Sequence, residues 1–473
     1  MNRTTVFLGM AAALALLALV LGLPGRITAG GGPQPPPPPP KVTQPPAQTT
    51  DGSIRMQARL SHPFIASGQS DVFVTADLKG VDVPGSQRAP VNLAVIIDRS
   101  GSMSGQKLQD AKNAARHLVN QLRDEDRLAI VHYGSDVRTF PATMATPSNR
   151  DRMLRYIDNI FDEGGTNIGD GLSAGRDQLL SAIREFRVNR IILISDGQPT
   201  EGMTDPSDLR EVVRRIRADG VSVSSIGVGT DFNEDLMQSF AEIGAGSYAY
   251  LRDASQLATI FQKDLQHAST LVGRGVQLTF ELPSGVELGE VLGYHANQSG
   301  QSVMISLPDF AAGQVERVVA RLVVRAGNAG QTIDVSALKL AYQDLLNGDA
   351  ATQSDIRLSA MVTSKPEEVL AHQDREATVT ATRAQSAANT YKAAESLKRG
   401  DRARAVQLIQ ANQSMFEQAG RVAGPAAVQA DQAEQKAMLD DFQAAKSDEE
   451  VQHQVKASKR KALIDYGKIT STY

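Results

Sequence analysis

The sequence contains no cysteine and no tryptophan, and aromatic residues make up only 5% of its 473 residues. The lack of cysteine excludes disulfide bonds, thiolate metal sites, cysteine nucleophiles and the anchoring cysteine of a lipoprotein. It does not identify the compartment, since exported proteins can also lack cysteine. The small number of aromatic side chains disfavours a surface that stacks on sugars or bases. The net charge is only −4, so it implies neither nucleic acid nor an anionic membrane surface as a partner.

The signatures of common catalytic sites are also missing. There is no P-loop of the form GxxxxGK[ST], no G-x-S-x-G nucleophile elbow, and no histidine spacing typical of a catalytic pair or a metal site. Residues 101–105 resemble the elbow only superficially, because Met103 stands where the nucleophile would have to be. We interpret His132, which lies on a strand pattern, as a core histidine. The chain is therefore expected not to be an enzyme, with a metal-dependent hydrolase as a minor alternative.

The first 51 residues predict an exported protein. Arg3 precedes a charge-free apolar run, Val6 to Leu23, whose length fits either a signal peptide or a membrane anchor. A cleavage site near Ala29 is imperfect because Ile27 occupies the −3 position, so cleavage and retention of residues 1–28 both stay open. Residues 29–51 hold glycines and six consecutive prolines at 35–40, which favour an extended spacer. We expect a cell-envelope location, either membrane-anchored or secreted or periplasmic, with the membrane contacted only through the N-terminal segment.

Residues 90–268 alternate strand and helix patterns, as a doubly wound, mostly parallel α/β sheet requires. The strands are expected at 93–97, 128–133, 191–195, 221–228 and 247–250, with a short antiparallel edge at 137–140. The helices are expected at 107–122, 150–160, 168–186, 206–219, 233–243 and 254–266, with Asp253 as the N-cap of the last. At 473 residues, the chain has room for further domains.

Two β-rich stretches flank this α/β region. Residues 52–89 contain strand patterns at 54–60 and 72–78, and residues 269–363 contain patterns at 275–282 and 316–324. Two strands alone are not a stable domain. We therefore expect the early strands to pair with the late ones in a β-sandwich into which the α/β domain is inserted. Residues 364–473 are predicted to be helical.

One stretch carries the candidate site. The apolar run Leu93 to Ile97 predicts a strand buried on both faces, and it ends in Asp98, Ser100 and Ser102. In a locally extended chain every second side chain points the same way, so these three are expected to converge. A carboxylate with two hydroxyls is an oxygen-only ligand set, which suits a hard cation such as Mg²⁺.

Two later loops supply further oxygen ligands. Thr166 lies on a glycine-rich loop before a helix, and Asp196 follows a second buried strand. Both lie where α/β sheets place their sites, outside the carboxyl ends of the strands. Asp98, Ser100, Ser102, Thr166 and Asp196 together resemble the metal-ion-dependent adhesion site of von Willebrand factor type A domains, whose pattern is Asp-x-Ser-x-Ser, a later Thr and a later Asp.

The resemblance implies a bound Mg²⁺, with Mn²⁺ or Ca²⁺ as alternatives, and an open coordination position for an acidic residue of a partner protein. It leaves open whether Asp196 binds the ion directly or through water. The competing interpretation is that Asp98 is a buried carboxylate satisfied by backbone N–H groups, with Ser100 and Ser102 as helix caps. Asp170 is assigned to the start of the following helix, and Arg99 is expected to face solvent.

The layout resembles exported bacterial type A proteins and inter-alpha-trypsin inhibitor heavy chains. We expect a non-enzymatic, metal-dependent, adhesion-type module that binds protein and not nucleic acid. The alternative is an envelope assembly scaffold that acts through the C-terminal helices and holds a purely structural metal. Arg399-Gly400-Asp401 spells an integrin-recognition tripeptide, but we interpret Gly400 as the end of one helix and Asp401 as the cap of the next.

Overall fold

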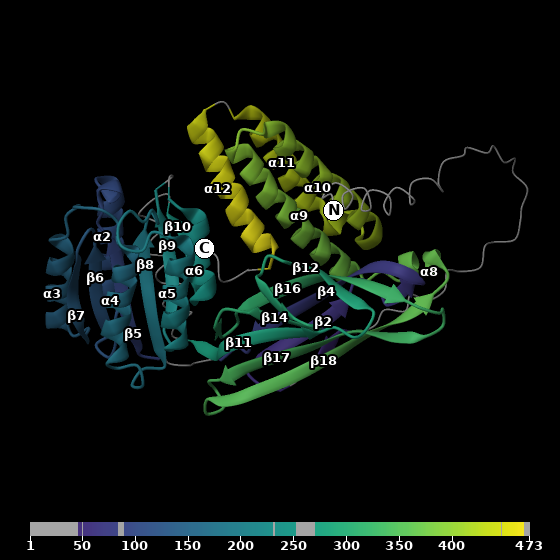
Figure 1. Ribbon diagram of the computed structural model, residues 1–473, viewed down its shortest axis with the longest axis horizontal. Coiled ribbons are helices and arrows are strands. Elements are labelled where there is room, and N and C mark those ends of the chain that lie inside the picture. The colour runs from purple at the N-terminus through teal and green to yellow at the C-terminus, as the bar shows by residue number, and fades with distance from the viewer. Residues whose placement is uncertain are drawn as a thin grey trace, which may run out of the picture. The chain divides into compact units, whose positions relative to one another are not determined.

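Figure 1 shows the computed structural model, which describes residues 46–49, 51–83, 89–229, 232–251, 270–445 and 447–467. The predicted leader, the proline run, and the helix expected at 254–266 with its cap at Asp253 lie outside the described residues. Among the residues that are described, no helix has both the length and the apolar character needed to cross a membrane.

A six-stranded sheet forms the α/β part, in the order β10-β9-β8-β5-β6-β7. All neighbours are parallel except β7, which runs antiparallel to β6 at the edge, as predicted. Every residue of the central strands β5 and β8 is buried, which explains their uninterrupted apolar runs. The strand bounds are Val91–Asp98 (β5), Arg127–Tyr133 (β6), Val137–Met144 (β7), Val188–Ser195 (β8), Ser222–Val228 (β9) and Ala245–Leu251 (β10).

Helices cover both faces of this sheet, so β5 contributes to two cores. Leu93, Val95 and Ile97 pack in one apolar cluster with α2, whereas Ala94 and Ile96 pack in another with α4, α5 and α6. The doubly wound fold predicted from the sequence is thus confirmed. The helix bounds are Gln106–Gln121 (α2), Pro147–Asp158 (α3), Ile168–Leu180 (α4), Pro206–Ala218 (α5) and Glu234–Ile243 (α6).

One helix ends earlier than predicted. We expected the helix that begins at Ile168 to reach residue 186, but α4 ends at Leu180 and turns follow it. The side-chain amide of Asn189 donates hydrogen bonds to the carbonyl oxygens of Ile183 and Phe186, at 3.1 and 2.9 Å. These carbonyls are therefore satisfied by a side chain from β8 and not by a continuing helix. His132, in β6, is only 5% exposed, as expected of a core histidine.

The remaining strands form two sheets that pack face to face. One sheet has the order β1-β2-β4-β16-β12, and the other has the order β13-β14-β11-β17-β18-β3, with β15 paired to β11. The bounds in the first sheet are Ala47–Gln48, Ile54–Leu60, Gly68–Gly80, Val315–Ala326 and Val286–Leu292. In the second they are Ala296–Ser299, Ser302–Ser306, Leu271–Glu281, Thr332–Asp344, Ala350–Thr363 and Phe64–Ala66, with β15 at Phe310–Ala311.

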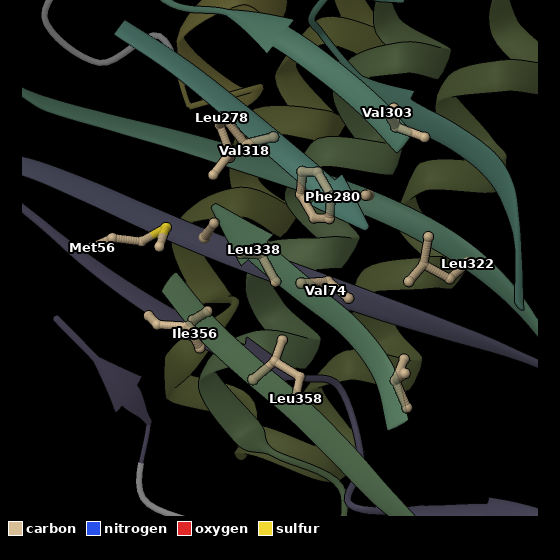
Figure 2. Close-up of a cluster of buried hydrophobic side chains, with 14 of the residues drawn as sticks. Met56, Val74, Leu278, Phe280, Val303, Val318, Leu322, Leu338, Ile356 and Leu358 are labelled. Carbon is tan, nitrogen blue, oxygen red and sulfur yellow. The ribbon is translucent and has the colours of Figure 1, made fainter. Parts of the chain in front are cut away.

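The early and late strands share this sandwich, as predicted. Strand β16 pairs antiparallel with β4 along the whole length of β16, from Val315 opposite Lys79 to Ala326 opposite Gly68. Side chains of both sheets fill one buried core, in which Met56 and Val74 of the first sheet face Phe280 and Leu338 of the second (Figure 2). The α/β part is therefore inserted between β4 and β11.

The C-terminal part of the described chain is helical, as expected. Asp401 is the N-cap of α10 and accepts a hydrogen bond from the backbone N–H of Arg404 at 3.0 Å, while Gly400 adopts a φ of 82°. The interpretation of the Arg-Gly-Asp tripeptide as a helix boundary is thus confirmed. The helices are Pro366–Ala371 (α8), Arg375–Lys398 (α9), Arg402–Ala423 (α10), Gln429–Ala444 (α11) and Asp448–Asp465 (α12).

Candidate metal centre

Asp98 is the fully buried last residue of β5, and it organises the candidate site. Its Oδ1 accepts hydrogen bonds from the Ser100 backbone N–H, at 2.9 Å, and from the Ser100 hydroxyl, at 2.6 Å. The Ser100 and Ser102 hydroxyl oxygens are in turn 3.1 Å apart. The structure therefore brings the first three predicted ligands into one cluster of oxygens.

The second oxygen of Asp98 has two partners that the sequence analysis missed. Ser195 Oγ donates to Asp98 Oδ2 at 2.6 Å, and the Tyr133 hydroxyl lies 3.2 Å from the same atom. Tyr133 stands directly opposite Asp98 in the β5–β6 register, and Ser195 ends β8 on the other side of β5. Because neighbouring parallel strands in register present side chains to the same face, the position of Tyr133 at a strand end was a usable signal.

Burial dominates the electrostatics of Asp98. Removal from water raises the pKa of its carboxyl group to about 6, and the nearby Asp196 carboxylate acts in the same direction. The hydrogen bonds from Ser100 and Ser195 favour the charged form and partly oppose the rise in pKa. Two carboxylates thus lie close together in a setting that disfavours their combined negative charge.

Backbone hydrogen bonds join the three loops that carry the predicted ligands. The Gly101 N–H donates to the Gly164 carbonyl at 3.1 Å, which ties the Asp98 loop to the loop of Thr166. The Thr166 carbonyl accepts from the N–H groups of Thr200, at 3.1 Å, and Glu201, at 3.2 Å. This second connection ties Thr166 to the loop that follows Asp196. All five predicted ligands therefore lie on connected loops at the carboxyl edge of the sheet.

Asp196 provides the test of fit for a cation. Its side chain is 1% exposed, and neither carboxylate oxygen has a hydrogen-bond donor. The ammonium group of Lys107 lies 3.6 Å away, too far for a hydrogen bond. A buried carboxylate without donors is costly unless a cation neutralises it. Because the five predicted metal ligands all offer side-chain oxygen atoms, the site fits a hard divalent cation such as Mg²⁺.

Ser100, Ser102 and Asp170 also have alternative interpretations as parts of helix ends. Ser100 stands at the N-cap position of a short 3-10 helix, Gly101–Met103, but its side chain makes no capping hydrogen bond there. The N-cap of α2 is Gly105, so neither serine caps that helix. The backbone N–H of Ser100 satisfies part of Asp98, as the competing interpretation required, but side-chain hydroxyls supply the other contacts. Asp170 lies in the first turn of α4 and accepts a hydrogen bond from Asn167 Nδ2 at 2.8 Å, so its assignment to that helix is confirmed.

The expectation that Arg99 faces solvent was wrong. Its side chain is 1% exposed, with Nη1 3.2 Å from the Glu163 carbonyl oxygen and 3.1 Å from Glu163 Oε2, and it also forms an ion pair with Asp136. Alternation along an extended chain correctly turns Arg99 away from the ligands. The neighbouring loops cover that other side, however, and their carboxylates allow the guanidinium to be buried.

A family model for the von Willebrand factor type A domain matches residues 92–263. The protein YfbK of Escherichia coli (strain K12) is 31% identical over 225 residues, which cover 47% of this chain and 38% of YfbK. Inter-alpha-trypsin inhibitor heavy chain H2 of Homo sapiens is 26% identical over 273 residues, which cover 56% of this chain and 29% of H2. The chain thus aligns with well under half the length of each of these two relatives.

A solved structure shows that the fold extends beyond the matched domain. The von Willebrand factor type A protein from Catenulispora acidiphila superposes with a TM-score of 0.66, over 88% of this chain and 96% of that chain, at 17% sequence identity. An identity this low supports a shared fold and not a shared function.

Proposed function

We propose that this chain, whose residues 92–263 match the family model of von Willebrand factor type A domains, binds a partner protein through a divalent cation. Such domains commonly mediate protein–protein interaction and adhesion. The finer proposal is that Asp98, Ser100, Ser102, Thr166 and Asp196 hold the cation and that an acidic residue of the partner completes its coordination. The ion would attract that carboxylate as a Lewis acid, and the protein would act by binding and not by turnover.

The observation that carries this proposal is the buried Asp196 carboxylate, whose two oxygens have no hydrogen-bond donor. The other residues have supporting roles. Ser195 and Tyr133 hold Asp98 Oδ2, which leaves Oδ1 with Ser100 on the side of the cluster that includes Ser102. The backbone hydrogen bonds that the Gly101 N–H donates and that the Thr166 carbonyl accepts hold the ligand-bearing loops together. This preorganisation limits the rearrangement that cation binding requires.

Titration calorimetry with MgCl₂ tests the metal site directly. We expect the wild-type chain to bind one Mg²⁺ and Asp98→Ala to bind none. Replacing exposed Asp170 by asparagine is the matched control, since this carboxylate belongs to a nearby helix turn and its variant should bind Mg²⁺ as the wild type does. Equal Mg²⁺ binding by wild type and Asp98→Ala would contradict the proposal.

We also propose that the domain is displayed outside the cytoplasmic membrane. The support is the sequence of the leader, an apolar run after Arg3 followed by a proline-rich spacer. Expression of the full chain with a C-terminal epitope, followed by protease treatment of intact cells or spheroplasts, tests this location. An epitope that is protected until the cytoplasmic membrane is broken would contradict it.

A further inference from the structure

Glu201 lies beside the candidate metal centre with a fixed carboxylate. Its Oε1 accepts a hydrogen bond from Ser135 Oγ at 2.9 Å, and the same hydroxyl accepts one from the Gly165 N–H at 2.8 Å. A Cβ atom placed on Gly165 would fall 2.4 Å from Glu201 Oε1, so the carboxylate lies directly against that backbone. Gly165 precedes Thr166, whose carbonyl accepts from the Glu201 N–H. The acidic group is therefore held next to a predicted ligand.

The positively charged side chains at this edge of the sheet form ion pairs with carboxylates other than that of Glu201. Lys107 lies 3.6 Å from Asp196, and Arg138 lies 2.8 Å from Asp136 and 3.4 Å from Glu163. Arg99 is buried between the same two acidic residues. Within the described part of the chain, the exposed Glu201 carboxylate has a hydroxyl partner and no ion pair. It thus presents uncompensated negative charge to an approaching molecule.

We propose that Glu201 selects partners in which the metal-binding acidic residue stands close to a lysine or arginine. This inference rests on the proposed function, because it assumes that a partner carboxylate approaches the cation. A purely acidic ligand would be repelled by Glu201 as it docks, whereas a neighbouring cationic side chain would form an ion pair with it. Charge complementarity of this kind discriminates between partners more than it raises overall affinity.

The Gly165 contact explains why Glu201 can act at this position. The absence of a side chain on Gly165 lets the carboxylate approach the ligand-bearing loop, and Ser135 fixes its direction. A carboxylate fixed by a hydrogen bond loses less conformational entropy when it forms an ion pair than a freely rotating one. Glu201 is not itself among the predicted ligands, so its charge can be altered while the metal site is kept.

Selection from a random peptide display library tests the inference. The full chain is immobilised in Mg²⁺, and peptides released by EDTA are sequenced for wild type, Glu201→Gln and Glu201→Lys. Wild type should enrich peptides that combine an aspartate or glutamate with a nearby lysine or arginine. Glu201→Gln should bind an enriched synthetic peptide about 3- to 10-fold more weakly, while its Mg²⁺ affinity changes by less than about twofold. Glu201→Lys should lose the preference for basic residues.

The control is Glu417→Gln, which removes an exposed carboxylate on α10 and should leave peptide affinity unchanged. Enrichment of acidic peptides without a basic preference, or equal peptide affinity for Glu201→Gln and Glu417→Gln, would overturn the inference and leave the proposed function standing. If wild type binds no Mg²⁺ in calorimetry, or yields no EDTA-released peptides, the proposed function fails and this inference fails with it.

Discussion

Replacing Asp196 by asparagine should separate two effects of this residue on stability, namely the cost of its buried charge and its contribution as a ligand of the metal ion. Without a cation, the wild-type site holds a 1% exposed carboxylate with no hydrogen-bond donor, beside the buried carboxyl group of Asp98. Asparagine keeps the shape and removes the charge. In EDTA we therefore expect Asp196→Asn to be more stable than wild type by about 1 kcal/mol. A buried carboxylate without hydrogen-bond donors costs a few kcal/mol, and loss of the ion pair with Lys107 offsets part of the gain from removing it.

In Mg²⁺ we expect the opposite order, with wild type more stable than Asp196→Asn. A ligand present at about 100 times its dissociation constant stabilises the native state by about 2.7 kcal/mol. For a domain of about 150–250 residues, each kcal/mol raises the unfolding temperature by about 2–4 °C. Saturating Mg²⁺ should thus raise the transition of the wild-type α/β domain by about 5–10 °C and that of Asp196→Asn by much less.

Differential scanning calorimetry measures the unfolding temperatures of wild type and Asp196→Asn, each in EDTA and in Mg²⁺. Asp98→Asn is the contrasting variant, since Asp98 accepts hydrogen bonds from Ser100 and Ser195 and its replacement should destabilise the protein even in EDTA. The reasoning is refuted if Asp196→Asn is less stable than wild type in EDTA, or if Mg²⁺ stabilises it as strongly as it stabilises wild type.

Three further predictions concern the rest of the chain. Burial lowers the pKa of His62 to about 4, so the neutral form contributes stability above pH 6.5 that is lost as pH falls toward 4. His62→Asn should remove about 2–3 kcal/mol of the acid destabilisation between pH 7 and 4.5 in urea titrations. Equal dependence of stability on pH in wild type and variant would contradict this. Phe280→Ala, in the sandwich core (Figure 2), should cost about 3–5 kcal/mol, and a loss below 1 kcal/mol would count against close packing there. Asp401→Ala should cost about 1 kcal/mol, whereas Asp401→Asn should retain the cap and most of the stability; equal losses in thermal unfolding would argue against a capping role.

The α/β architecture was predictable because β5 and β8 contain the uninterrupted apolar runs 93–97 and 191–194, and both strands are buried on both faces. That the early strands pair with late ones was also predictable, since two early strands could not form a stable sheet alone; the structure shows that β4 pairs with β16. Both inferences depend on patterns within short segments or on the minimum size of a stable unit. The predicted domain boundaries and the metal ligation stay predictions.

Individual side-chain contacts between distant segments were not predictable. Arg99 was expected to face solvent because nothing in its local sequence reveals that Asp136 and Glu163 cover it. The end of α4 depends on an amide from β8, and local periodicity does not report such a contact. For the site, alternation placed Asp98, Ser100 and Ser102 together. The contacts of Tyr133 and Ser195 with Asp98 depend on the register of three neighbouring strands, for which the strand-end position of Tyr133 was the available sequence signal.

The insertion of the α/β part into the sandwich has a consequence for biosynthesis. Asp77 of β4 and Arg317 of β16 form an ion pair, although they are 240 residues apart in the chain. During translation, the early strands therefore emerge long before the neighbour that completes their sheet, and their edges stay open to wrong pairing in the meantime. The inserted domain has all its own strands by then and can fold first, bringing its two ends together and shortening the search that closes the sandwich.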